Sequence, residues 1–181
     1  IFHLIKTIND NLQEGIFVTD VGFFKHYAIL FAQPQTAGQF ITDAGLSSFG
    51  TGLGAAAAAQ IAHPDKTIFL LCGDGGFQAS SCDLSTLVQQ QLPLIIIVAN
   101  TRSYELIHRY QLKRADSKKE ANETITSFGP VDYVLLAKAH GCNAFYAKTV
   151  EELHYHISMH DKKKPIVIEC PITYKEFLSQ S

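Results

Sequence analysis

The chain has 181 residues, a formal net charge of -2, 46% hydrophobic residues and 18% charged residues. This composition is that of one globular domain with a sizeable core, and it excludes an intrinsically disordered chain. The sequence has no broad basic stripe and no apolar run of membrane-spanning length, so we expect neither a nucleic-acid partner nor a membrane partner.

Short β-branched runs alternate with helical patterns along the chain. In chain order they predict a strand at 15–19, a helix at 23–32, a strand at 40–42, a helix at 52–62, a strand at 67–72, a helix at 79–91, a strand at 94–99, helices at 103–112 and 130–140, a strand at 143–147, a helix at 149–160 and a strand at 166–169. Strands that are apolar on both faces, with helices between them, indicate a doubly wound α/β fold. We therefore expect a mostly parallel sheet with helices on both faces, and ligands beyond the carboxyl ends of its strands.

Two further segments carry weaker expectations. The charged stretch 113–123 lacks apolar periodicity and is predicted to be an exposed or mobile loop. The aromatic residues of the helix at 23–32 suit either core packing or a subunit interface, and they are Phe23, Phe24, Tyr27 and Phe31.

The cysteines bear on the cellular compartment. The four cysteines, at positions 72, 82, 142 and 170, form no C-x-x-C pair. We therefore expect free, mostly buried thiols in the reducing cytoplasm. The chain opens with Ile1 and not with Met, so we expect either a fragment or one subunit of a larger protein.

A glycine-rich turn follows the strand that ends at Cys72. Its sequence is Gly-Asp-Gly-Gly-Phe, with Asp74 at the carboxyl end of a buried strand. Glycines let backbone N–H groups approach an anion, but the Asp74 carboxylate would repel a phosphate. A magnesium ion between the two resolves this conflict. The alternative is a tight strand-to-helix turn in which Asp74 is only a helix N-cap.

A second polar segment follows the next apolar strand. The run Ile-Ile-Ile-Val-Ala ends at Ala99 and is followed by Asn100, Thr101, Arg102 and Ser103. Neighbouring parallel strands lie about 4.8 Å apart. Their carboxyl ends can therefore present Asp74 and this second segment to one ion, and oxygen ligands suit magnesium.

This order of segments resembles the signature of thiamine-diphosphate enzymes, in which Gly-Asp-Gly is followed by a strand ending in Asn-Asn. Segments similar to acetolactate synthases lie at 19–22, 45–50, 73–78 and 165–174, so the resemblance spans roughly residues 10–175. It implies a thiamine-diphosphate-binding fold, with residues 1–181 as a single cofactor domain. It also implies an enzyme that decarboxylates a 2-keto acid and transfers the acyl carbanion to an acceptor.

The resemblance implies thiamine diphosphate and Mg2+ as cofactors. The implied metal ligands are the Asp74 carboxylate, Thr101 at the position of the family's second asparagine, and the Ser103 carbonyl. The family also places a large apolar side chain, here Phe49, beneath the bent cofactor. The implied cofactor-binding residues are Gly22, Ser47, Ser48, Phe49, Gly73, Asp74, Gly75, Gly76, Asn100, Ser103 and Tyr104.

Several positions depart from the family pattern. Thr101 replaces an asparagine metal ligand, and phenylalanines stand where acetolactate synthases place polar diphosphate contacts, so Lys25 or His26 would have to substitute for them. Glu105 takes a position usually held by glycine. Tyr110 stands in place of a tryptophan that shapes the second-substrate pocket.

The activating glutamate of the family lies on a separate pyrimidine-binding domain, usually of the facing subunit. No segment of these 181 residues resembles that domain. We therefore expect no catalytic residue in this chain, no turnover by the chain alone, a partner domain or subunit that carries the glutamate, and a homo-oligomer (dimer or tetramer). The alternatives are a subunit of a split 2-keto acid decarboxylase and a non-catalytic relative of this fold.

A histidine cluster lies on the last predicted helix. His154, His156 and His160 share this helix, and the last two are one turn apart, a spacing that could bind zinc. A solvated helix face is the favoured interpretation.

Overall fold

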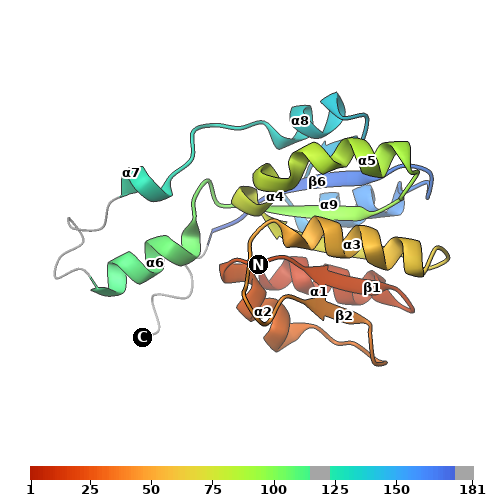
Figure 1. Ribbon diagram of the computed structural model, residues 1–181, viewed down its shortest axis with the longest axis horizontal. Coiled ribbons are helices and arrows are strands. Elements are labelled where there is room, and N and C mark those ends of the chain that lie inside the picture. The colour runs from red at the N-terminus through yellow and green to blue at the C-terminus, as the bar shows by residue number, and fades with distance from the viewer. Residues whose placement is uncertain (115–122, 174–181) are drawn as a thin grey trace.

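The computed structural model describes residues 1–114 and 123–173, which fold around one parallel sheet (Figure 1). The six strands are β1 (Ile16–Thr19), β2 (Phe40–Thr42), β3 (Ile68–Gly73), β4 (Ile95–Asn100), β5 (Asn143–Tyr146) and β6 (Ile166–Pro171). Their order across the sheet is β2-β1-β3-β4-β6-β5, and each neighbouring pair is parallel. The predicted doubly wound α/β class is confirmed.

Helices cover both faces of this sheet. In chain order they are α1 (Phe2–Leu12), α2 (Phe23–Phe31), α3 (Thr51–Ala62), α4 (Asp74–Ser80), the 3-10 turn η1 (Ser81–Asp83), α5 (Leu84–Gln89), α6 (Glu105–Arg114), α7 (Glu123–Thr126), α8 (Tyr133–Ala139) and α9 (Val150–Ser158). One core cluster joins α1, α2 and α9 to the sheet, and the other joins α3, α4, α5 and α8. Figure 1 shows α6 and α7 projecting from the rest of the domain.

The central strand β3 illustrates why the sheet is stable. All six of its residues are buried, and successive side chains enter opposite clusters, with Phe69 and Leu71 on one face and Leu70 on the other. Fully burying one such side chain contributes about 1.5–3 kcal/mol relative to exposing it. The carboxyl ends of the strands are therefore rigidly held, and so are the residues that directly follow them.

One predicted boundary is wrong. The helix predicted at 79–91 begins at Asp74, directly after β3, and η1 interrupts it. A Cβ at Gly75 would lie 2.7 Å from the Tyr104 ring, and one at Gly76 would collide with the Asp20 carboxylate. Glycines here thus allow close packing within the first turn of α4 despite their low helix propensity. Gly73, not Asp74, is the N-cap, so the N-cap alternative is wrong.

Other segments differ from the prediction in part. The helix α1 was not predicted, although its apolar residues recur on one face and are buried. In the predicted loop at 113–123, α6 continues to Arg114 and α7 begins at Glu123, while residues 115–122 lie outside the described part of the chain. Phe24 and Tyr27 belong to the core, which favours core packing, one of the two roles considered for them.

None of the helices in residues 1–114 and 123–173 has the length and apolar content needed to span a bilayer.

Candidate functional site

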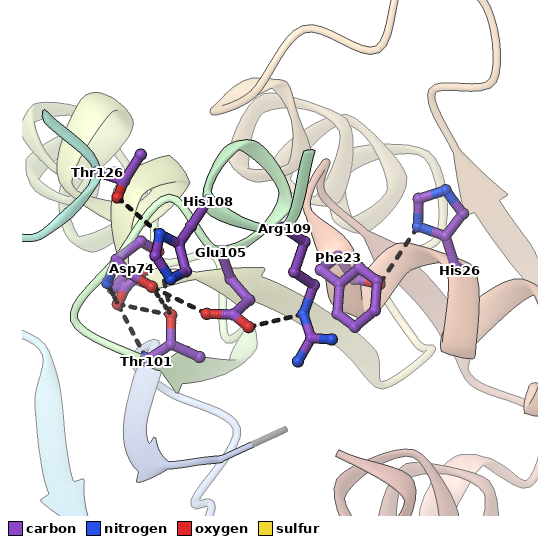
Figure 2. Close-up of polar contacts among 9 residues, drawn as sticks. Phe23, His26, Asp74, Thr101, Glu105, His108, Arg109 and Thr126 are labelled. Atoms are coloured by element: carbon purple, nitrogen blue, oxygen red, sulfur yellow. Dashed lines mark hydrogen bonds and ion pairs between the residues drawn. The ribbon is translucent and has the colours of Figure 1, made fainter. Parts of the chain in front are cut away.

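The carboxyl ends of β3 and β4 lie side by side. Gly73 of β3 pairs with Ala99 of β4, so the residues that follow them meet at one edge of the sheet. Asp74 Oδ2 accepts the backbone N–H group of Thr101 at 2.9 Å (Figure 2). It also accepts the backbone N–H group of Ser103 at 3.3 Å. The predicted meeting of Asp74 with this second segment is confirmed.

Three oxygen atoms converge at this point. The Thr101 hydroxyl donates to the Ser103 carbonyl at 3.0 Å and lies 3.4 Å from Asp74 Oδ2. In octahedral magnesium coordination, with bonds of about 2.0–2.1 Å, neighbouring ligand oxygens lie about 2.9 Å apart. Both distances from the Thr101 hydroxyl lie within about 0.5 Å of that separation. The donor set of one carboxylate, one hydroxyl and one carbonyl therefore fits magnesium.

The Asp74 carboxyl is almost fully buried, with 3% of the residue exposed. Burial raises its pKa above the ordinary value, whereas hydrogen bonds from the backbone N–H groups of Gly75, Thr101, Arg102 and Ser103 act in the opposite direction. A buried negative charge is costly unless a positive charge accompanies it. A divalent cation at the three oxygens would supply that charge.

A cavity of about 380 Å³ opens beside these oxygens. Its volume lies in the range of small-molecule sites. Ten of the predicted site residues line it, namely Gly22, Ser47, Phe49, Gly73, Asp74, Gly75, Gly76, Thr101, Ser103 and Tyr104. Two predicted residues, Ser48 and Asn100, are not among its lining residues.

The loop that carries Ser47 is fixed by two buried charges. Asp20, at the end of β1, accepts the N–H groups of Gly50 at 2.9 Å and Gly52 at 3.2 Å, which places the start of α3. Lys25 Nζ donates to Ser47 Oγ at 2.8 Å and to the backbone carbonyl of residue 43 at 3.0 Å. Lys25 thus shapes the cavity wall without lining it, and the cavity lining includes neither Lys25 nor His26.

An ion pair lies at the mouth of the cavity. Arg109 Nε donates to Glu105 Oε1 at 2.7 Å within α6, and Glu105 Oε2 accepts from the Ser103 hydroxyl at 3.1 Å. The Arg109 guanidinium lies 4.3 Å from the centre of the Phe23 ring, as Figure 2 shows. The i,i+4 spacing of Glu105 and Arg109 could have signalled the pair from sequence. The packing of Arg109 on Phe23 joins segments that are far apart in the sequence, so no local sequence pattern could have predicted it.

A second buried polar contact lies across β4 from this cavity. Asn100 Nδ2 donates to Glu169 Oε1 of β6 at 2.7 Å, and Asn100 Oδ1 accepts the N–H of Arg102 at 2.9 Å. Asn100 is 7% exposed and Glu169 is 6% exposed. The two residues and Thr101 border a separate cavity of about 660 Å³. The contact was not predicted from sequence.

The histidines of α9 are half-buried, not solvated as predicted. His154 lies 3.3 Å from both the Thr7 hydroxyl and the Asn11 side chain, and the His156 ring stacks on Phe145. Within residues 1–114 and 123–173, no group of three or more His, Cys, Asp or Glu side chains is placed to share a metal ion. The zinc hypothesis therefore finds no support.

Comparison with known proteins identifies the family. Residues 20–170 match the family described as thiamine pyrophosphate enzyme, C-terminal TPP binding domain. The chain belongs to this family. Among similar proteins, the acetolactate synthase large subunit of Porphyra purpurea is 29% identical over 176 residues, which are 96% of this chain and 29% of that protein. The corresponding subunit of Lactococcus lactis is 27% identical over 173 residues, 95% of this chain and 30% of that protein. This chain therefore spans less than a third of the length of these relatives.

A solved structure shares the fold. The thiamine diphosphate-dependent 4-hydroxybenzoylformate decarboxylase of Rhodococcus jostii RHA1 superposes with a TM-score of 0.83 at 21% identity, covering 96% of this chain and 32% of that one. The thiamine-diphosphate-binding fold predicted from sequence is thereby confirmed.

Proposed function

We propose that this chain binds the diphosphate of thiamine diphosphate through a Mg2+ ion held by Asp74, Thr101 and the Ser103 carbonyl. The observation that carries the proposal is the convergence of these three oxygens at the wall of a cavity of about 380 Å³. We propose further that the chain serves an acetolactate-synthase-like enzyme, which decarboxylates a 2-keto acid and transfers the acyl carbanion to an acceptor. Similarity to acetolactate synthase large subunits supports this assignment.

When bound, thiamine diphosphate supplies the electron sink for such chemistry. The residues of this chain hold and orient it. The three oxygens anchor the cation, and Gly75 and Gly76 let the backbone approach the diphosphate closely. Phe49 is 53% exposed and meets the Tyr104 ring edge-to-face, with ring centres 6.0 Å apart. This aromatic pair can therefore support an organic ring and exclude water from one side of it.

We propose that residues 1–181 form one cofactor domain and that the activating glutamate belongs to a pyrimidine-binding domain elsewhere in the protein or on a partner subunit. In this arrangement the chain carries no catalytic residue and works within a homo-oligomer. This chain covers less than a third of the length of each of these relatives. That partial cover supports placing the cofactor site and the activating glutamate in different domains. The four cysteines, at positions 72, 82, 142 and 170, are all free, which supports a cytoplasmic location.

Two variants of this function have observations in their favour. The cover of less than a third of the acetolactate synthase relatives is also what a subunit of a split 2-keto acid decarboxylase would show. Phe23, Phe24 and Thr101, which depart from the family pattern and line the cavity, favour a non-catalytic relative. A measurement of cofactor binding distinguishes the non-catalytic relative, which we expect to bind no cofactor, from the two enzymes.

Calorimetry of the chain with thiamine diphosphate, with Mg2+ and with EDTA, tests the proposal. We expect binding that requires Mg2+ and is lost when thiamine replaces thiamine diphosphate. The variant Asp74→Asn should abolish this binding, whereas the matched control Asp10→Asn, on the exposed face of α1, should leave it unchanged. Equal binding in Mg2+ and EDTA, or none in Mg2+, would refute the proposed cation site.

A further inference from the structure

The turn at residues 100–103 carries two of the three proposed cation-binding oxygens. A contact between Asn100 and Glu169 holds this turn on the side away from the cofactor cavity. Resting on the proposed function, we propose that Glu169 is a positioning residue of the cation site. It acts through Asn100 and fixes the conformation of residues 100–103, so that the Thr101 hydroxyl and the Ser103 carbonyl face Asp74. Glu169 itself does not line the cofactor cavity.

The turn has a conformation that its sequence alone does not favour. Arg102 has φ 57°, in the left-handed region that side chains other than glycine and asparagine rarely adopt. Such a residue persists only where surrounding contacts hold it. One of these contacts is the hydrogen bond from the Arg102 N–H to Asn100 Oδ1 at 2.9 Å, an Asx-turn. The orientation of the Asn100 amide is therefore one determinant of the turn, beside the hydrogen bonds from the Thr101 and Ser103 N–H groups to Asp74 Oδ2.

Glu169 decides that orientation. An asparagine side chain has an oxygen that accepts and a nitrogen that donates, and a half-turn of the amide exchanges them. The Glu169 carboxylate accepts only, and its Oε1 lies 2.7 Å from Asn100 Nδ2. With the amide nitrogen held by Glu169, the oxygen faces the Arg102 N–H. In the opposite orientation, two acceptors would meet at Glu169 and two donors at Arg102.

The position of Glu169 within β6 strengthens this inference. The residues on either side, Ile168 and Cys170, are buried and apolar, and Val167 enters the core on the same face of the strand. A carboxylate at 6% exposure in such a strand is unfavourable unless a donor satisfies it. Its contact with Asn100 is charge-assisted, and such hydrogen bonds are about twice as strong as neutral ones. Because β6 is held firmly in the sheet, Glu169 can keep the turn in place through its hydrogen bond with Asn100.

Amide hydrogen exchange in the cofactor-free chain tests the positioning directly. Glu169→Leu should lower the protection of the Thr101, Arg102 and Ser103 amides about tenfold or more relative to Val167→Ala. Val167→Ala is a matched control, because it weakens the same strand without touching the turn. Equal protection in the two variants would overturn the proposal.

A second pair of variants covers the case in which Glu169→Leu does not fold. Asn100→Asp keeps an acceptor for the Arg102 N–H but places a carboxylate against Glu169, so it should lower protection in the same way. Adding Glu169→Gln supplies a donor to the new carboxylate and should restore protection. A merely structural role would not predict this rescue, and failure of the double variant to recover would count against the proposal.

Binding of Mn2+ with thiamine diphosphate, followed by electron paramagnetic resonance, gives the functional readout. Contacts behind metal ligands typically change affinity 10- to 100-fold. We expect at least a tenfold loss for Glu169→Leu, less than a threefold loss for Glu169→Gln and none for Val167→Ala. If the unaltered chain binds no Mn2+ with the cofactor, the proposed function fails, and the exchange experiment still decides the role of Glu169.

Discussion

Replacing Thr101 by valine removes one proposed ligand oxygen and keeps the shape of the side chain. In the cofactor-free chain, the change deletes the hydrogen bond from the Thr101 hydroxyl to the Ser103 carbonyl at 3.0 Å. A hydrogen bond of this kind contributes about 0.5–1.5 kcal/mol to the free energy of unfolding. The larger expected effect is on stabilisation by thiamine diphosphate and Mg2+ together.

The size of that effect follows from binding linkage. Ligand at about 100 times its Kd stabilises a protein by about 2.7 kcal/mol, and a tenfold weaker Kd reduces this to about 1.4 kcal/mol. Even contacts behind metal ligands change affinity by about 10-fold or more, so tenfold is a lower bound for a ligand. Unfolding entropy of about 2.1 cal/mol/K per residue gives about 0.38 kcal/mol/K for 181 residues. The rise in Tm on adding ligand should therefore fall from about 7 °C to about 4 °C or less.

Thermal unfolding with and without the ligands measures this difference. Thr42→Val is the matched control, because the Thr42 hydroxyl is buried and has no hydrogen-bond partner within residues 1–114 and 123–173. It should show the full ligand-induced rise in Tm, and Thr101→Asn, which restores the family's residue, should show an equal or larger one. If Thr101→Val shows the same rise as Thr42→Val, then the Thr101 hydroxyl is not a ligand.

Two further outcomes concern charged residues around the cavity. Burial raises the pKa of Asp20 above its ordinary value of 3.8, against the opposing effect of backbone N–H groups. The folded chain thus holds this proton more tightly than the unfolded chain, and the stability that Asp20 contributes falls as pH rises above 3.8. The free energy of unfolding of Asp20→Asn minus that of wild type, measured by denaturant unfolding, should therefore increase as pH rises above 3.8, and a difference that decreases over that rise would contradict this. Glu105→Gln removes a negative charge from the cavity and should tighten thiamine diphosphate binding about threefold at low salt and less at high salt. The exposed Glu151→Gln on α9 should not, and equal Kd values for these two variants by calorimetry would argue against a diphosphate near Glu105.

The sheet could be predicted from sequence because its strands are contiguous apolar runs between turn residues. The runs at 67–72 and 94–99 differ from β3 and β4 by one residue at each end. The helix range predicted at 79–91 missed the first turn of α4, because glycine has a low helix propensity and tertiary packing overrides it. Gly75 and Gly76 are helical where Tyr104 and Asp20 approach them closely.

The core of the candidate site could also be predicted, for a topological reason. Asp74 and Thr101 follow strands that are neighbours both in sequence and in the sheet, so their contact depends on no distant pairing. Lys25 and His26 show where this reasoning fails. Both follow Phe23 and Phe24 in sequence, but Lys25 reaches Ser47 and His26 lies near the Phe23 carbonyl. Contacts between distant segments, such as Asn100 with Glu169, leave no periodic signal.

The helix α6 has no buried residues, whereas Asp74 and Asn100, at the tips of β3 and β4, are both buried. Substitutions at exposed helix positions usually change stability by no more than about 0.5 kcal/mol, and those in a buried network cost far more. Evolution can therefore alter exposed residues of α6 such as Ile107 and Tyr110 with little penalty to folding, while the buried residues at the strand tips tolerate few replacements. This unequal tolerance would let related domains diversify along α6 while they inherit the same strand tips.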